Sequence, residues 1–253
     1  MLGAIARRLC ARESGGHPLR VGIDGVCGAG KTTFAKDLAE HLTAHGRPVV
    51  RIDSDGFHHI REIRYRQGKD SARGYYQDAY DFDSVRDLVL VPLGSSGPHR
   101  YASRVYDLLT DAVVREWATA PADAIVLFDA TFLQRDDLCG HWDEVIYLDA
   151  DTRLAQARGL ARDEKALGGP DAAALAYEMR YMAACTMYLS EQNPMQRASI
   201  VVHHDDPARP RLIRLSRPAR AERPPDTKPV SPDGQTMFTG CFPVSGRSSA
   251  LRR

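Results

Sequence analysis

The chain has 253 residues, of which 26% are charged and 43% hydrophobic, and its formal net charge is +1. This composition is ordinary for a soluble globular protein, and it gives neither a strong basic field for nucleic acid nor an apolar run long enough to cross a membrane. The five cysteines are scattered and show no C-x-x-C spacing, which argues against a disulfide framework or a zinc site and favours a cytoplasmic protein.

The first element in chain order is a short amphipathic helix, expected over residues 2–12 and ended by Gly15 and Gly16. We interpret residues 1–18 as this helix and a lead-in, followed by one main domain over residues 19–215. A chain of this length can bury a full core as one domain.

Residues 19–45 read as a buried strand, a glycine-rich loop and a helix. The loop matches the pattern G-x-x-x-x-G-K-[ST] at every fixed position through Gly25, Val26, Cys27, Gly28, Ala29, Gly30, Lys31 and Thr32, with Thr33 following. Backbone N–H groups of such a loop surround phosphate oxygens, the lysine reaches the β- and γ-phosphates, and the hydroxyl binds Mg²⁺. The sequence therefore predicts a site for a nucleoside triphosphate.

Two residues of this stretch have competing interpretations. Loop N–H groups could favour a thiolate at Cys27 and make it redox-active, but a small residue tolerated in the loop is the preferred interpretation. Asp24, beside the loop, is expected to support the loop geometry rather than to take part in chemistry.

The chain continues as strands that alternate with helices, which predicts a parallel α/β sheet with right-handed crossovers. In the second half of the chain, residues 171–192 have helical spacing. We expect this helix to pack through Leu175, Met179, Met182, Cys185 and Leu189. We predict strands at 48–53, 124–128, 145–148 and 199–202, helices at 83–91, 152–167 and 171–192, a hairpin at 101–117, and a loop with short helical pieces at 61–79.

Residues 216–253 hold six of the fifteen prolines, few apolar residues and no periodicity. Their composition predicts a disordered tail. We therefore expect truncation near Ser216 to leave the activity and the melting temperature almost unchanged.

Carboxylates at strand ends decide whether a phosphate loop can belong to a kinase, because ligands bind beyond the carboxyl ends of parallel strands. Asp129 follows a continuous apolar strand directly and is expected to hold Mg²⁺ opposite Thr32. Asp55 lies two residues beyond the second strand and is expected to accept the proton of an attacking hydroxyl; Asp53 is its competitor.

Phosphoryl transfer also needs positive charge around the transferred group. Arg158 and Arg162 lie four residues apart on one predicted helix face, and Arg153 is near them. We expect Arg158 and Arg162 to close over the phosphates, the alternative being solvated arginines paired with Asp163 or Glu164.

These residues resemble the uridine kinase family, in the branch that also contains phosphoribulokinase and bacterial pantothenate kinase. The resemblance spans roughly residues 19–206 and rests on the loop GVCGAGKTT, the stretch SDGFHH, the pair Tyr106-Asp107, the strand end IVLFDATFL and the helix RLAQARGLARD. It implies a P-loop NTPase fold of the α/β class, a three-layer sandwich with a mostly parallel sheet, a small hairpin insertion over the acceptor site and a helical lid. It also implies that Asp55 is the general base, that Asp129 organises Mg²⁺ and that Arg162 belongs to the lid.

The acceptor side departs from the family pattern. His58 stands where uridine kinases usually have an aromatic residue, and Asp111 lies where a histidine would read the pyrimidine edge. We expect His58, His59, Tyr76, Tyr106 and Asp107 to line the acceptor pocket.

The sequence thus predicts an ATP- and Mg²⁺-dependent kinase of a small hydroxylated molecule, with uridine or cytidine as the leading acceptor. Pantothenate-like, sugar and natural-product acceptors stay open, as does a regulatory ATPase. A homo-oligomer is compatible with the sequence, and no nucleic-acid or membrane partner is expected.

Overall fold

The computed structural model describes residues 1–13 and 15–216. Residues 217–253, which hold nearly all of the predicted tail, lie outside the described part, so the tail stays a prediction. The helices are α1 (Leu2–Cys10), α2 (Lys31–Ala44), α3 (Arg61–Arg64), α4 (Ala72–Asp78), α5 (Phe82–Val85), α6 (Thr152–Asp163), α7 (Pro170–Ala176), α8 (Ala183–Gln192) and α9 (Pro194–Arg197), with 3-10 turns η1 (Ser54–Phe57) and η3 (Cys139–His141) and π-helical turns η2 (Arg86–Leu90) and η4 (Tyr177–Met182).

The strands form a six-stranded sheet and a separate two-stranded hairpin among the described residues. The sheet order is β2-β5-β1-β6-β7-β8, in which the first five strands run parallel and β8 is antiparallel to β7. The strands are β1 (Leu19–Gly25), β2 (Val49–Asp53), β3 (Arg100–Asp107), β4 (Ala112–Thr119), β5 (Ile125–Asp129), β6 (Glu144–Asp149), β7 (Ile200–His203) and β8 (Arg211–Leu215).

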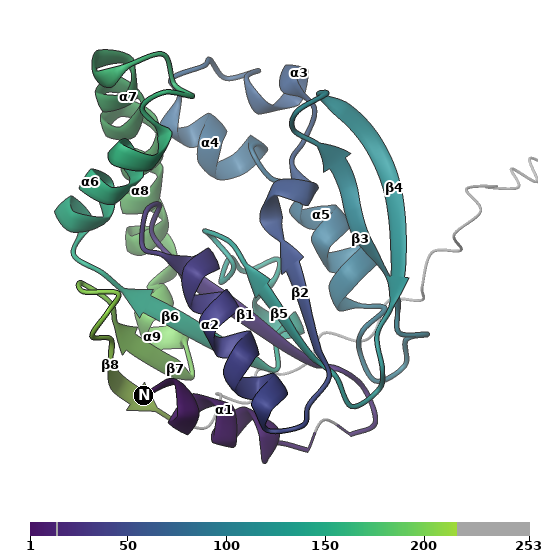
Figure 1. The fold of residues 1–253 in the computed structure, drawn as a ribbon. Coiled ribbons are helices and arrows are strands. Elements are labelled where there is room, and N and C mark those ends of the chain that lie inside the picture. The colour runs from purple at the N-terminus through teal and green to yellow at the C-terminus, as the bar shows by residue number, and fades with distance from the viewer. Residues whose placement is uncertain (14, 217–253) are drawn as a thin grey trace, which may run out of the picture.

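The central strands β1 and β5 are buried along their whole length, as expected of parallel strands covered on both faces. On one face α2 crosses β1, with Phe34, Leu38 and Leu42 in the core, and α1 packs against α2 (Figure 1). Because Ile5 and Leu9 of α1 are fully buried, the N-terminal helix is part of the same core rather than a loose lead-in.

The remaining elements surround the carboxyl ends of the strands. The hairpin of β3 and β4 lies along one side of the molecule, and α6, α7 and α8 lie on the opposite side (Figure 1). The segment that carries α3 and α4 bridges them, since α4 contacts α8 and η4, and Arg64 of α3 donates to Tyr106 and Asp111 of the hairpin. The strand ends therefore face a space enclosed by three separate segments of the chain.

The structure confirms the predicted parallel sheet and hairpin, and it corrects the helix at residues 171–192. Its middle turn, η4, is π-helical, which adds a residue to the turn and rotates the helix face beyond it. The residues before and after this turn therefore do not share one continuous face: Leu175 and Met179 are exposed rather than packed, whereas Tyr177 and Tyr188 are buried. The helix predicted at 152–167 ends earlier, at Asp163, and strand β8 was not predicted.

None of the described helices is both long enough and apolar enough to span a lipid bilayer.

Candidate active site

A cleft of about 650 Å³ lies at the carboxyl ends of β1, β2 and β5. Ten of the residues predicted for the site line it: Cys27, Gly28, Gly30, Lys31, Thr32, Thr33, Asp55, His58, Asp129 and Arg162. The cleft is thus formed by the phosphate loop, the end of β5, the turn η1 and helix α6, which are far apart in the sequence.

The phosphate loop has the backbone that its glycines permit. Gly30 adopts a left-handed conformation (φ 89°) directly before α2 begins at Lys31. A Cβ at Gly28 would lie 2.0 Å from the carbonyl oxygen of Ala155 in α6, so only glycine allows this approach. The Lys31 ammonium donates to the carbonyls of Gly25 (3.0 Å) and Val26 (2.9 Å), which keeps it over the loop.

The two residues predicted to hold Mg²⁺ are in direct contact. The Thr32 hydroxyl donates to the Asp129 carboxylate at 2.6 Å. Asp129 is 4% exposed, and this burial raises the pKa of its carboxyl group, while the hydrogen bond from Thr32 opposes the rise. A hydroxyl beside a carboxylate is an oxygen donor set of the kind that Mg²⁺ prefers.

Asp55 projects into the cleft from η1, whose N-cap is Asp53: the backbone N–H of Asp55 donates to the Asp53 carboxylate at 2.8 Å. The competitor Asp53 is therefore engaged in capping, and it is the register partner of Asp129 across β2 and β5. The Asp55 side chain is 71% exposed, with Nε2 of His58 at 3.7 Å. The neighbouring His58 ring lowers the pKa of Asp55.

The two predicted arginines lie apart. Arg162 lines the cleft and forms a two-point ion pair with Asp163, with both N–O distances at 2.8 Å. The hydroxyl of Tyr177 donates to the same carboxylate at 2.6 Å and so fixes it. Arg158 instead donates to the backbone carbonyls of His204 (3.4 Å) and Asp205 (3.1 Å), outside the residues that line the cleft.

The predicted acceptor residues are only partly brought together. Tyr106 is buried, and its hydroxyl donates to Asp111 and accepts from Arg64, whose Nη2 also donates to Asp111 at 3.0 Å. Tyr106 lines a second cavity of about 520 Å³ under the hairpin, of which His58 and His59 are also walls. Asp107 accepts from the backbone N–H of Leu109 at 2.9 Å and so closes the hairpin turn.

The two tyrosines of α4 lie differently from the prediction. Tyr75 lines the cleft, whereas Tyr76 is packed against Phe132, with its ring under Arg135. In a helix of seven residues, a one-residue difference in position turns a side chain by about 100°, and the sequence pattern did not fix this rotation.

Cys27 and Asp24 lie behind the loop. The backbone N–H of Cys27 donates to Sγ of Cys185 at 3.4 Å, and the neighbouring Cys185 thiol, with the charge of Lys31, lowers the pKa of Cys27. Asp24 is fully buried and accepts from the Gly25 N–H and from the hydroxyl of Tyr188, in line with the expected support of the loop.

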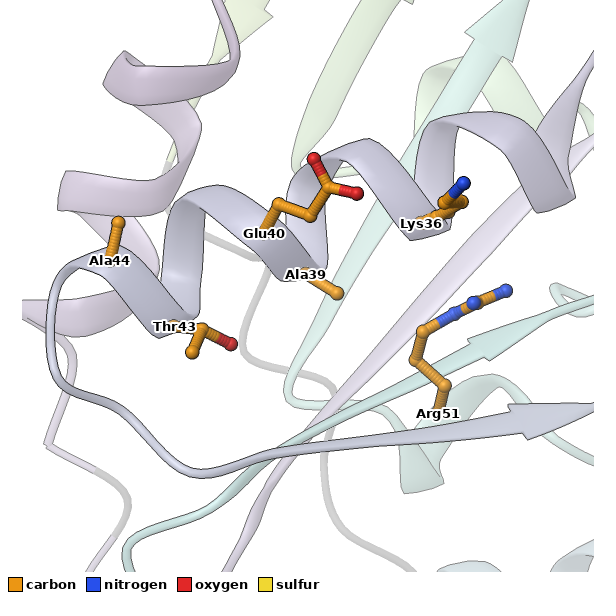
Figure 2. A pocket seen from close by; sticks show the side chains of 6 residues that line it. All are labelled: Lys36, Ala39, Glu40, Thr43, Ala44 and Arg51. Atoms are coloured by element: carbon orange, nitrogen blue, oxygen red, sulfur yellow. The ribbon is translucent and has the colours of Figure 1, made fainter.

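Another hollow lies on the outer side of the molecule, between α2 and β2 (Figure 2). It is lined by Lys36, Ala39, Glu40, Thr43, Ala44 and Arg51. None of the predicted site residues reaches it, so it has no part in the site.

The sequence profile of the phosphoribulokinase / uridine kinase family matches residues 20–206, which include the loop, both carboxylates and Arg162. The chain belongs to this family. Its membership makes the protein a P-loop kinase that uses ATP and transfers a phosphoryl group to a hydroxyl acceptor.

Individual relatives agree with the family. The uridine kinase of Brevibacillus brevis is 25% identical over 150 residues, which cover 58% of this chain and 67% of the relative. A solved structure from Bacillus stearothermophilus, described as a possible uridine kinase, is 24% identical with a TM-score of 0.64 and covers 79% of this chain and 96% of its own. The phosphoribulokinase of Rhodobacter spheroides shares the fold at 18% identity and a TM-score of 0.55, covering 75% and 71%.

Several cleft residues of this family member were not predicted. Thr131 accepts a hydrogen bond from Lys31 at 3.0 Å. Its position two residues after Asp129 could have identified it, because alternate residues of an extended segment share a face. Arg64 and Tyr75 come from a stretch without periodicity, so no pattern identified them. Within the described ranges no group of three His, Cys, Asp or Glu residues could hold a metal ion.

Proposed function

We propose that this kinase transfers the γ-phosphate of ATP, with Mg²⁺, to a hydroxyl of a pyrimidine nucleoside, uridine or cytidine being the first candidates. The observation that carries the proposal is the meeting of Lys31, the Thr32–Asp129 pair and Asp55 in one cleft. A nucleotide switch that only hydrolyses ATP has no need of a base such as Asp55 beside the phosphate loop.

Each residue has a role that its position supports. The loop N–H groups and Lys31 bind phosphates, and Thr32 and Asp129 would hold Mg²⁺, which when bound neutralises phosphate charge. Asp55 removes the proton of the acceptor hydroxyl and orients its oxygen toward the γ-phosphate. Arg162 supplies positive charge at the same cleft.

The residues on the acceptor side of the cleft are polar and suit a ligand with polar groups along one edge. Asp111 lies on the hairpin turn in a left-handed conformation (φ 52°), beside Tyr106 and Arg64. Arg64 lines the cleft, and its guanidinium donors suit the C=O groups of a pyrimidine edge, while Asp111 is not among the lining residues and holds Arg64 in place. Pantothenate-like, sugar and natural-product acceptors remain the alternatives, since these groups also occur in them.

The test is ADP formation from ATP and Mg²⁺ with uridine, cytidine, pantothenate, ribose and simple sugar phosphates, beside a reaction without acceptor. We expect turnover with a pyrimidine nucleoside that exceeds the acceptor-free rate by several orders of magnitude. Turnover with another compound alone would replace the nucleoside. A rate that no acceptor changes would favour the ATPase.

A further inference from the structure

The His58 ring is held by three contacts with two neighbours, Ala79 and Tyr80. Its Nδ1 lies 2.9 Å from the carbonyl oxygen of Ala79, and its plane packs on Tyr80 with the ring centroids 4.4 Å apart. The backbones of His58 and Tyr80 also form a bridge between the two segments. The side chain is 11% exposed, so the ring has one orientation in the wall between the cleft and the cavity under the hairpin.

This arrangement fixes which ring nitrogen faces the proposed base. A carbonyl oxygen can only accept, so Nδ1 carries the hydrogen that it donates to Ala79. In the neutral ring Nε2 is then an unprotonated acceptor, and it lies 3.7 Å from Oδ1 of Asp55. Because the Asp55 side chain is 71% exposed, a small rotation closes the distance.

We propose that His58 is a positioning residue that acts through Asp55: it takes over the proton that Asp55 removes from the acceptor. The hydroxyl oxygen of the acceptor forms a bond to the γ-phosphorus, while the bond between that phosphorus and the ADP oxygen breaks. The O–H bond of the acceptor breaks in the same step. The proton passes to Oδ1 of Asp55 and then to Nε2 of His58, which becomes an imidazolium and releases the proton to solvent. This inference rests on the proposed role of Asp55.

The proton transfer requires the neutral form of the His58 ring. The neutral ring accepts the proton at Nε2 and the imidazolium cannot. The charged or titratable groups around His58 are Asp55 of η1, His59, Tyr80, Asp81, Arg115 of β4 and, across the cleft, Arg64 of α3.

The first experiment measures kcat and KM with ATP, Mg²⁺ and uridine for the wild type, His58→Ala and His58→Gln. The amide of the glutamine variant can still donate to the Ala79 carbonyl but is not a base, so both variants are expected to lose kcat by about 100-fold. KM for ATP is expected to stay unchanged, since the ring does not touch the loop. An unchanged kcat in both variants would overturn the proposal.

Chemical rescue separates proton transfer from packing. In His58→Ala the removed ring opens the wall toward the cavity of about 520 Å³, so small heterocycles can enter. Imidazole is expected to restore part of kcat, with greater effect at pH values where it is neutral. Pyrazole has the same shape and is a far weaker base, and equal rescue by pyrazole would show that the ring only fills space.

Two controls separate this inference from the proposed function. Asp55→Asn is expected to be inactive with or without imidazole. If it is active, the base is wrongly assigned and the inference fails with it; if it is inactive while His58→Ala is fully active, only the inference fails. Without any acceptor, ¹³C NMR of the Asp55 carboxyl is expected to show a higher pKa in His58→Gln, and an unchanged pKa would contradict the coupling.

Discussion

Among single residues, Asp129 is the one whose burial most clearly opposes its proposed function. Its carboxylate is almost fully buried, which favours the protonated form, yet the Mg²⁺-binding role proposed for it requires the ionised form. The hydrogen bond from Thr32 stabilises the ionised form, but the pKa of Asp129 is still raised. In this proposed role, we expect protons to compete with Mg²⁺ at higher pH than they would for an exposed aspartate.

We predict that Asp129→Asn lowers kcat by about 100-fold and raises the Mg²⁺ concentration needed for half-maximal activity. In the wild type this concentration should rise as the pH falls, because the raised pKa of Asp129 leaves less carboxylate, and in Asp129→Asn this pH dependence should disappear. Titration of activity with Mg²⁺ at several pH values measures both effects.

The matched control is Asp53→Asn on the neighbouring strand, which preserves a cap for η1. It should keep the pH dependence of the Mg²⁺ requirement. If Asp53→Asn and Asp129→Asn behave alike, Asp129 is not the residue that organises the metal.

At the scale of elements, the contact between α6 and η4 positions the cationic side of the cleft. Gly159 of α6 lies against Tyr177 of η4, so close that an added Cβ would be 2.3 Å from the tyrosine hydroxyl. That hydroxyl fixes Asp163, which in turn fixes Arg162. The glycine thus helps to determine where the guanidinium of Arg162 lies in the cleft, although the glycine itself does not line the cleft.

Gly159→Ala is expected to destabilise the protein by about 1–3 kcal/mol, because the methyl group displaces the ring of Tyr177. It should also lower kcat, since Arg162 loses its support. Gly3→Ala in α1 is the control: its added Cβ would meet nothing closer than Nη1 of Arg7 at 3.7 Å, and alanine favours a helix. Melting curves and kcat for both variants test the prediction, and equal behaviour would contradict it.

The elements also show what the sequence could and could not predict. The apolar runs ending at Phe128 and Leu148 became buried parallel strands, because strands covered on both faces leave a continuous pattern. The π-helical turn at Tyr177–Met182 leaves no such pattern, so the faces of Leu175 and Met179 were predicted wrongly. The same holds for Tyr75 and Tyr76, where a short helix gives too few residues to define a face.

On the scale of the whole molecule, one buried carboxylate joins the N-terminal helix to the sheet. Glu144 of β6 is fully buried at its side chain, and it forms ion pairs with Arg8 of α1 and with Arg12 just beyond the helix. It also accepts from the hydroxyl of Ser199, directly before β7. The beginning and the end of the described core therefore meet at this carboxylate.

Glu144→Ala is expected to lower the free energy of unfolding by about 3 kcal/mol, because two partly buried arginines lose their partner. Arg7→Ala, at an exposed position of the same helix, should change it by no more than about 0.5 kcal/mol. Urea unfolding of both variants makes the comparison. A loss below about 1 kcal/mol in Glu144→Ala would mean that apolar packing alone holds α1.

Across the molecule the phosphate half of the site was more predictable than the acceptor half. The loop and the strand end place Lys31, Thr32 and Asp129 by local sequence alone, and the structure puts them together. The acceptor side is assembled from α3, α4 and the hairpin tip, whose relative positions depend on tertiary packing. Arg64 was missed for this reason.

The most direct test of the central claim compares wild type and Asp55→Asn with ATP, Mg²⁺ and uridine, with phosphorylated product measured beside ATP binding. We predict product from the wild type, a loss of at least about 100-fold in Asp55→Asn, and nearly equal ATP affinity, since the loop is untouched. Full turnover by Asp55→Asn, or ADP release by both proteins that no acceptor changes, would contradict a kinase mechanism built on Asp55.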